Sequence, residues 1–243
     1  MTANYPVRRH RDATIIDAGE IHIIVAGDSC GGIGNKEADA FRVPTSTVGS
    51  YNARVALMEV LSLGAQVVSV FDMVCNEMNP TASEILAGIR TELEKAGLAD
   101  IVINGSTEEN FITKMTAVGV TVIGVAEKGK LKSAPIRPHD RGILIGRPLC
   151  GGGVIAHPEL LADYQDLKDL VSDPHIREVV PVGSKGILYE AEFLAQGNAL
   201  HFEPENCGID LLTSAGPASC IIAVTEDRHI PENPPHILLG EFL

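Results

Sequence analysis

The chain has 243 residues, of which 45% are hydrophobic, and its formal net charge is −13. This length is enough for one large domain or two small ones, each with a hydrophobic core. The acidic balance argues against a general nucleic-acid-binding surface, because such surfaces are basic. No apolar run approaches the length of a membrane span, and the basic first residues lack the apolar segment of a secretory signal. We therefore expect neither a nucleic-acid partner nor a membrane partner.

The cysteine and histidine patterns exclude two further classes of protein. The five cysteines are scattered and form no C-x-x-C pair, which favours reduced thiols in a cytoplasmic protein over a disulfide framework. The eight histidines show neither H-x-x-x-H nor H-E-x-x-H spacing, so a zinc hydrolase is disfavoured.

Strands and helices are expected to alternate along the first half of the chain. The expected elements are strands within 13–26, a helix over 47–63 that Gly64 ends, a strand over 66–71, a helix that runs from a Thr81–Glu84 capping box to Gly97, and strands over 100–103 and 118–125. The polar segment 128–141 contains two prolines and indicates a domain junction. We place the boundary after residue 132, which gives domains 1–132 and 133–243.

The second half continues the alternation. The expected elements are a strand over 142–145, a glycine loop at 151–153, helices over 158–171 and 185–195, a strand over 220–225 and an irregular tail. The fold class is therefore mixed α and β. The loop 183–186 places backbone N–H groups at a helix N-terminus, which suits an anion or a substrate, and an ordinary helix entry explains it equally well.

The segment 21–36 carries the clearest chemical signal. An apolar, β-branched run ends in Gly27-Asp28, and three glycines and a lysine follow: Gly31, Gly32, Gly34 and Lys36. Glycines let backbone N–H groups approach phosphate oxygens, an aspartate can hold a divalent cation, and a lysine can neutralise a phosphate. The spacing matches neither a P-loop nor a dinucleotide fingerprint. A bound metal–phosphate group is therefore one interpretation of this segment, and an ordinary turn is the other.

Further carboxylates follow predicted strands. Asp72 follows QVVSVF, and Glu108 and Glu109 follow IVIN. Because strand ends of one sheet lie side by side, these groups can converge on one site together with Asp28. Several carboxylates beside a glycine–lysine loop suit Mg–ATP, although such residues also cap helices and favour turns.

The predicted helix 47–63 adds two polar residues to this picture. Asn52 and Glu59 are seven residues apart, so they share one face of a largely apolar helix. A carboxylate in such surroundings needs a partner. That partner is a metal ion or ligand, or a cation such as Lys36 or Arg42 in a structural ion pair.

The order of these motifs resembles the superfamily of ATP-binding enzymes that contains aminoimidazole ribonucleotide synthetase and thiamin-monophosphate kinase, the PurM-like superfamily. Three stretches are similar to its GD loop, its helix followed by GA, and its GG-x-T loop: Gly27-Asp28, Asn52 to Gly64-Ala65, and Asn104 to Glu108. The resemblance implies a two-domain α+β fold with an ATP-binding N-terminal domain and a shortened C-terminal domain.

Within this superfamily, GDSCGGIG, GSTEEN and PVGSKGILYEAE are similar to motifs of the α-ribazole kinase-like proteins of cobalamin lower-ligand salvage. The resemblance implies phosphoryl transfer from ATP, with Mg²⁺, to α-ribazole or a related nucleoside, in a homodimer. Two positions depart from the family pattern, since Glu59 and Ser106 stand where relatives often carry Asp. Another ATP-dependent reaction of the superfamily and a non-catalytic nucleotide-binding module are the alternatives.

The resulting candidate site has three groups of residues. The catalytic residues would be Asp28 and Lys36. The ATP-binding residues would be Gly27, Asp28, Gly31, Gly32, Gly34, Lys36, Asn52, Gly105, Ser106 and Thr107. The Mg²⁺ ligands would be drawn from Asp28, Glu59, Asp72, Glu108 and Glu109.

Overall fold

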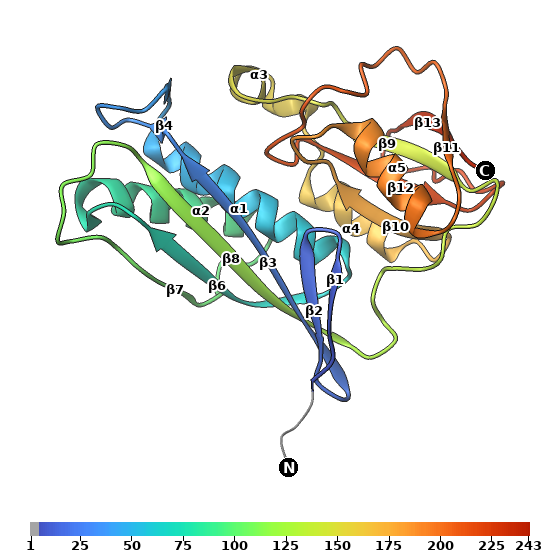
Figure 1. Cartoon of the computed structure of the whole chain (residues 1–243), viewed down its shortest axis with the longest axis horizontal. Coiled ribbons are helices and arrows are strands. Elements are labelled where there is room, and N and C mark those ends of the chain that lie inside the picture. The colour runs from blue at the N-terminus through green and yellow to red at the C-terminus, as the bar shows by residue number, and fades with distance from the viewer. Residues whose placement is uncertain (1–4) are drawn as a thin grey trace. The chain divides into compact units, whose positions relative to one another are not determined.

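A computed structural model describes residues 5–243, which form two compact units (Figure 1). The first unit extends through Leu61 and from Ala65 to Lys130, and the second contains Ser62–Gly64 and Leu131–Leu243. The chain therefore passes from one unit to the other inside the polar segment 128–141. Among residues 5–243, none of the helices is both long and apolar enough to cross a bilayer.

The first unit is built on a six-stranded sheet with the order β1-β2-β3-β8-β6-β7. Its strands are β1 (Val7–His10), β2 (Ala13–Asp17), β3 (Ile21–Gly31), β6 (Gln66–Val74), β7 (Ile103–Ser106) and β8 (Ala117–Glu127). All neighbours are antiparallel except β6 and β7, which run parallel. A short parallel pair, β4 (Ile33–Gly34) and β5 (Phe41–Arg42), follows β3.

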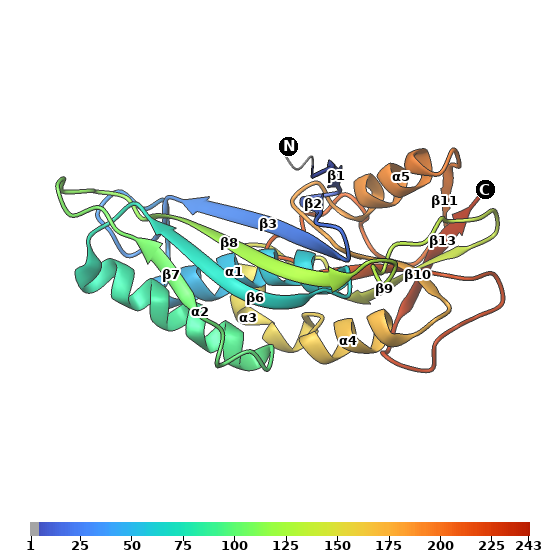
Figure 2. The same ribbon diagram turned by 90° about the horizontal axis from the view of Figure 1, so that it is seen from below.

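Two helices cover one face of this sheet (Figure 2): α1 (Thr45–Ser62) and α2 (Ser83–Lys95), the latter preceded by the turn η1 (Met78–Ala82). Two glycines let the helices approach closely. A Cβ on Gly49 would lie 2.0 Å from the carbonyl oxygen of Ile85, and one on Gly88 would lie 1.8 Å from that of Ser46. The helices therefore contact one another backbone to backbone, and any larger residue would force them apart.

The two faces of the first sheet differ in burial. Along β8, Val118, Val120 and Val122 are buried beneath the helices, and the residues between them are half-buried. On β6 the opposite face carries Val68 and Met73, whose exposed fractions are 42% and 43%. This second face is apolar, and no described helix of the first unit covers it (Figure 2).

The second unit is a five-stranded antiparallel sheet with the order β10-β12-β9-β13-β11. Its elements are β9 (Arg141–Gly146), α3 (Gly152–Ala156), η2 (Pro158–Leu160), α4 (Tyr164–Ser172), β10 (Ile176–Pro181), α5 (Ile187–Gly197), β11 (Phe202–Pro204), β12 (Cys220–Thr225) and β13 (Ile237–Phe242). Apolar residues of α5 and the sheet form its core, among them Ile187, Ala191, Val180 and Phe242.

Several expected elements are confirmed. Helix α1 covers the predicted helix 47–63, and Gly64 ends it with a φ of +73°, a conformation that glycine adopts without strain. The predicted strands 66–71, 118–125, 142–145 and 220–225 are parts of β6, β8, β9 and β12, and helix α5 lies two residues beyond its predicted bounds. The mixed α and β class is also confirmed.

Four local predictions are wrong. Thr81 does not cap α2, because its hydroxyl donates to Glu77 and the turn η1 runs directly into the helix. The strand predicted at 100–103 begins only at Ile103. The glycine loop at 151–153 enters the short helix α3. The helix predicted over 158–171 begins only at Tyr164, because Asp163 accepts hydrogen bonds from the backbone N–H groups of residues 165 and 166 and so caps it there.

Candidate functional site

Two of the predicted acidic residues lie in one row across the first sheet. Asp28 of β3 pairs with Val120 of β8, Val120 pairs with Asp72 of β6, and Asp72 pairs with Gly105 of β7. Directly paired residues project from the same face of a sheet, and Val120 is fully buried beneath the helices. Asp28 and Asp72 therefore face the helices, two strands apart, with Cα atoms roughly 10 Å from one another.

Asp28 is held by helix α1. The side-chain amide of Asn52 donates a hydrogen bond of 2.6 Å to Oδ2 of Asp28. Asn52 is only 3% exposed, and its Oδ1 is buried with no hydrogen-bond partner among residues 5–243. Burial raises the pKa of Asp28, and hydrogen bonds from Ser29 and Asn52 offset this effect only in part. The carboxylate and the amide oxygen together form an electron-rich pair, and no cation of the described part of the chain lowers the pKa of Asp28.

Asp72 is 4% exposed, and burial raises its pKa as well. Its carboxylate fills the space above Gly105, since a Cβ at that position would lie 2.4 Å from Oδ2 of Asp72 and 2.1 Å from its carbonyl oxygen. Position 105 must therefore be glycine because Asp72 occupies the space that a side chain would need, and this reason holds with or without a bound ligand. The carboxylate of Asp72 thus lies against β7, the neighbour of β6 on the side away from β3.

The oxygen donors of this row suit a hard divalent cation. Carboxylates and amide oxygens are the side-chain groups that Mg²⁺ prefers, and burial raises the pKa of both Asp28 and Asp72. Among residues 5–243, no group of three or more His, Cys, Asp or Glu side chains is arranged to hold a metal. Asp28, Asn52 and Asp72 thus supply side-chain oxygens on one face of the sheet.

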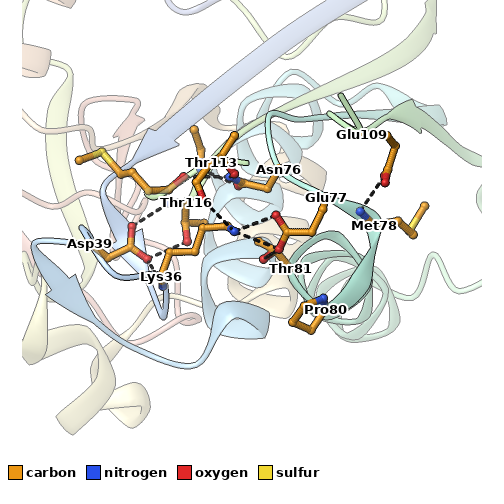
Figure 3. Close-up of polar contacts among 12 residues, drawn as sticks. Lys36, Asp39, Asn76, Glu77, Met78, Pro80, Thr81, Glu109, Thr113 and Thr116 are labelled. Atoms are coloured by element: carbon orange, nitrogen blue, oxygen red, sulfur yellow. Dashed lines mark hydrogen bonds and ion pairs between the residues drawn. The ribbon is translucent and has the colours of Figure 1, made fainter. Parts of the chain in front are cut away.

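Lys36 does not lie open to a ligand. Figure 3 shows its ammonium group beside Glu77 and Thr113. The three contacts of Nζ are to Oε1 of Glu77 at 3.0 Å, Oε2 of Glu77 at 2.7 Å and the carbonyl oxygen of Thr113 at 3.1 Å. Burial acts to raise the pKa of Glu77, but Lys36 and the hydroxyl of Thr81 outweigh it and lower that pKa to about 2. Since an ammonium group has three donors, the hydrogen-bonding capacity of Lys36 is filled.

A second carboxylate, Asp39, fixes the glycine-rich segment. It accepts hydrogen bonds from the backbone N–H of Lys36 at 2.7 Å and from the N–H and hydroxyl of Thr116 at 2.8 and 2.7 Å (Figure 3). Gly34, with a φ of +148°, packs against this pair, since a Cβ there would lie 2.4 Å from Oγ1 of Thr116. The N–H of Gly32 donates to the carbonyl oxygen of Thr116.

The remaining glycines of this segment lie apart from the acidic row. Gly27 precedes Asp28 on β3 and so projects from the opposite, uncovered face, across from Thr121. Gly31 ends β3, and a Cβ at this position would meet nothing within 4 Å. Neither position is forced to be glycine by a protein neighbour closer than 3.0 Å.

Glu59 lies against a cation of its own unit. Its Oε2 is 3.6 Å from the guanidinium of Arg11, and the side chains of both residues are at least nine-tenths buried. Arg11 stands in the turn between β1 and β2, so this pair anchors the N-terminal hairpin to helix α1. The sequence allowed two kinds of partner for Glu59, a metal ion or ligand and a cation in a structural ion pair. The contact with Arg11 corresponds to the second.

The loop after β7 uses its polar groups internally. Glu108 accepts hydrogen bonds from the backbone N–H groups of Asn110 and Phe111, and Glu109 accepts from the N–H of Met78 and the hydroxyl of Thr107. Ser106 pairs with Met73, so it projects from the face opposite to Asp72. The structure therefore does not bring Ser106, Glu108 or Glu109 into the row of Asp28 and Asp72.

The sequence reasoning missed Asp39, Asn76 and Glu77. Asn76 is fully buried, donates to Oγ1 of Thr113 at 2.7 Å and to the carbonyl oxygen of Met115 at 2.8 Å, and accepts from the N–H of Ala117. The available signal was position, because Asn76 and Glu77 lie two and three residues after the end of β6. Asp28 and Asp72, by contrast, lie inside β3 and β6, so the prediction that they follow the ends of their strands is wrong.

In the second unit, the loop 183–186 enters α5 as a glycine-capped turn. Gly186 has a φ of +84°, and a Cβ there would lie 2.9 Å from the carbonyl oxygen of Leu211. That carbonyl accepts the N–H of Leu188, and the ammonium of Lys185 lies 4.2 Å from the ring centre of Tyr189. The loop near Leu211 therefore covers part of the helix N-terminus.

No family model matches the chain, and no curated protein matches it. Solved structures are similar. Thiamine monophosphate kinase (ThiL) of Aquifex aeolicus is 11% identical with a TM-score of 0.70, over 96% of this chain and 89% of that one. The same kinase in complex with AMPPCP and TMP is 12% identical with a TM-score of 0.66, over 95% and 84%.

Two other structures extend the comparison. HypE of E. coli, a hydrogenase maturation protein, is 13% identical with a TM-score of 0.65, over 90% of this chain and 79% of that one. PurL of T. maritima in complex with ATP is 15% identical with a TM-score of 0.61, over 96% of this chain and 37% of that one. At such identities the likeness is one of fold, and it confirms the α+β fold that the motif resemblance implied, which this chain shares with ThiL and HypE.

Proposed function

We propose that the chain is an ATP- and Mg²⁺-dependent phosphotransferase that acts on a hydroxyl group of a small nucleoside-like molecule. The observation that carries this proposal is the helix-facing row of Asp28, which is half-buried, and Asp72, which is buried, in a fold shared over 95% of the chain with a kinase structure that holds AMPPCP and TMP. The motif resemblance adds α-ribazole as the acceptor to test first.

The chemistry of the row supports a metal–nucleotide ligand. Phosphoryl transfer depends on position and on neutralisation of phosphate charge, so a bound Mg²⁺ would supply electrostatic stabilisation and no covalent nucleophile is needed. Asp28 and Asp72 would hold the cation together with phosphate oxygens, and Asn52 would orient Asp28 through its 2.6 Å hydrogen bond.

A homodimer accompanies the proposal. The uncovered face of the first sheet carries Val68, Phe71 and Met73, and a second copy of the chain is the partner that the motif resemblance implies. Sedimentation should show a dimer, and Val68→Glu should shift it towards monomer. A wild-type chain that sediments as a monomer at every concentration would remove this part of the proposal.

The direct test incubates purified protein with Mg–ATP and α-ribazole and follows both ADP and the 5′-phosphate by mass spectrometry. The expected result is equal formation of the two products. Release of ADP without a phosphorylated nucleoside would indicate another acceptor. The absence of both products, over a panel of nucleosides and related alcohols, would remove the kinase assignment.

Another ATP-dependent reaction of the superfamily is the second candidate, since PurL of T. maritima in complex with FGAR also shares the fold, with a TM-score of 0.61. Release of ADP and phosphate with an amide substrate, followed by ring closure, would favour it. A non-catalytic nucleotide-binding module is the third candidate, and tight ATP binding without turnover on any substrate would favour it.

A further inference from the structure

We infer that Glu77 is a positioning residue of the proposed nucleotide site and that it acts through Lys36, which holds loops together and does not contact phosphate. The inference rests on the proposed function, because it concerns the loops at the edge of that site. It changes the role of the lysine that the sequence marks as a phosphate ligand.

The contacts of Lys36 carry the first step. Its side chain is 17% exposed, and both carboxylate oxygens of Glu77 lie within 3.0 Å of Nζ. The third donor of the ammonium group points to the carbonyl oxygen of Thr113. A phosphate could gain Lys36 only if Glu77 were left part-buried without its cation, with the hydroxyl of Thr81 as its remaining side-chain donor, and breaking a pair of this kind is costly.

The second step concerns the segments of the chain that the ammonium group of Lys36 joins. Lys36 belongs to the glycine-rich segment, Glu77 follows β6 and Thr113 precedes β8, so one ammonium group joins three segments that are distant in sequence (Figure 3). The backbone of Lys36 is bound in turn to Asp39, which holds Thr116. The same loops are therefore fixed at two independent points.

The third step connects these loops to the acidic row. Asn76, the neighbour of Glu77, binds the chain at Thr113, Met115 and Ala117, at the first residues of β8. Three residues after Ala117 in the same strand, Val120 separates Asp28 from Asp72. Glu77 and Asn76 thus fix the end of the strand that sets the spacing between the two acids.

Charge exchange distinguishes a positioning role from a phosphate contact. The variants are Lys36→Glu, Glu77→Lys and the exchanged double variant, and each is measured for Mg–AMPPCP affinity by calorimetry. If Lys36 only ties the loops, each single variant loses about tenfold or more in affinity, since a part-buried charge is left facing a like charge. The double variant restores the opposite charges and returns to within about threefold of wild type, because the loops are tied again.

The exposed pair of Lys114 and Glu37 provides a matched control. It joins the glycine-rich segment to the segment before β8, as the contact of Lys36 with Thr113 does, at 3.6 Å, but both side chains are at least 70% exposed. The corresponding single and double charge exchanges at these positions should leave AMPPCP affinity and the unfolding midpoint unchanged, because exposed pairs contribute little.

Recovery of thermal stability without recovery of AMPPCP affinity in the double variant would overturn the inference, because it would assign Lys36 to the phosphate. Should the exchanged variants not fold, Glu77→Gln distinguishes the same two roles of Lys36, the positioning role and the phosphate contact. A positioning role predicts weaker AMPPCP binding, and a KM for ATP that rises by a larger factor than kcat falls. A competition between Glu77 and phosphate for Lys36 predicts tighter binding, which would contradict our inference.

Hydrogen exchange separates failure of this inference from failure of the proposed function. If wild-type protein binds no nucleotide, the proposed function fails. The role of Glu77 in holding the loops is then tested by amide exchange in segments 31–42 and 107–117, which should accelerate in Glu77→Gln and remain slow in the Lys114 control. Equal exchange in Glu77→Gln and wild type would contradict the inference without any ligand.

Discussion

Two groups of carboxylates in the first unit differ in their surroundings. One is the acidic row of Asp28 and Asp72, and the other is the loop network of Asp39 and Glu77 with their donors Thr116 and Lys36. Burial raises the pKa of Asp28 and Asp72, and no cationic side chain among residues 5–243 acts to lower either of them. Glu77 and Asp39 are also buried in part, but hydrogen bonds from Lys36 and from Thr116 lower their pKa values. The carboxylates of the loop network therefore have donors that lower their pKa, whereas the pKa values of the two acids of the row are raised with no cation to offset burial among residues 5–243.

This difference separates structural from functional polar groups in a way that motif spacing does not. The glycine–lysine segment carries the strongest sequence signal, yet its lysine is engaged with Glu77 and its Gly32 amide with Thr116. The weaker signal, a single aspartate after each of two apolar runs, leads to the row whose acids have no cation that lowers their pKa among residues 5–243. A site for a metal–nucleotide ligand is more consistent with this row.

The largest expected effect is at Asp28. Asp28→Asn removes a proposed metal ligand, so we expect turnover to fall by about 100-fold or more, a loss on the scale of one removed transition-state contact. Stability should be unchanged or slightly higher, because an uncompensated buried charge is lost. Steady-state kinetics and thermal unfolding without ligand measure the two quantities. Full turnover in this variant would rule out the metal role of Asp28.

The opposite pattern is expected at Glu77. Glu77→Gln should lower the free energy of unfolding by about 2 kcal/mol, an intermediate value because the carboxylate is paired but part-exposed. Urea denaturation measures this difference. Lys114→Gln, which breaks an exposed ion pair on the same loops, is the control and should change stability by less than about 0.5 kcal/mol.

A pair of glycine substitutions tests how closely Asp72 packs against its neighbouring strand β7. Gly105→Ala places a Cβ 2.4 Å from the carboxylate of Asp72, so we expect a loss of roughly 1–3 kcal/mol in stability and weaker Mg–ATP binding. Gly31→Ala meets nothing within 4 Å, and its stability should match wild type. Equal stability of the two variants would contradict the packing of Asp72 against Gly105.

The smallest expected effect is in the pH dependence of stability. The lowered pKa of Glu77 stabilises the folded state above the ordinary pKa of 4.5, and this contribution is lost as the pH falls towards about 2. The raised pKa of Asp28 has the opposite sign, since its cost is present at neutral pH and is relieved as the pH falls. Stability of Glu77→Gln should therefore approach wild type at low pH, and parallel curves would contradict the assignment.

Much of the fold follows from local patterns in the sequence. Apolar periodicity predicts α1, and Gly64 marks its end because only glycine adopts that conformation without strain. Strand β7 is misplaced because its start depends on parallel pairing with β6, which no local pattern of 100–106 indicates. Strands β10 and β13 were also missed, since β10 interrupts its apolar run with Arg177 and Glu178 and β13 closes the sheet only through β9 and β11.

The site is predictable only as far as apolar runs can be located. Asp28 and Asp72 were identified because each follows an apolar run. The pairing of Lys36 with Glu77 spans 41 residues, and that of Arg11 with Glu59 depends on how a hairpin meets a helix. Such contacts are set by strand register and packing. Spacing along the chain therefore identifies candidate polar residues, but it does not identify the residue with which each of them pairs.

Calorimetric titration of Mg–AMPPCP into three proteins tests the central claim most directly. We predict that wild type binds only when Mg²⁺ is present, that the Lys36→Glu, Glu77→Lys double variant binds to within about threefold of wild type, and that Asp28→Asn loses binding by about 100-fold. Wild-type affinity in Asp28→Asn, together with lost affinity in the folded double variant, would contradict the account and assign the phosphate site to Lys36.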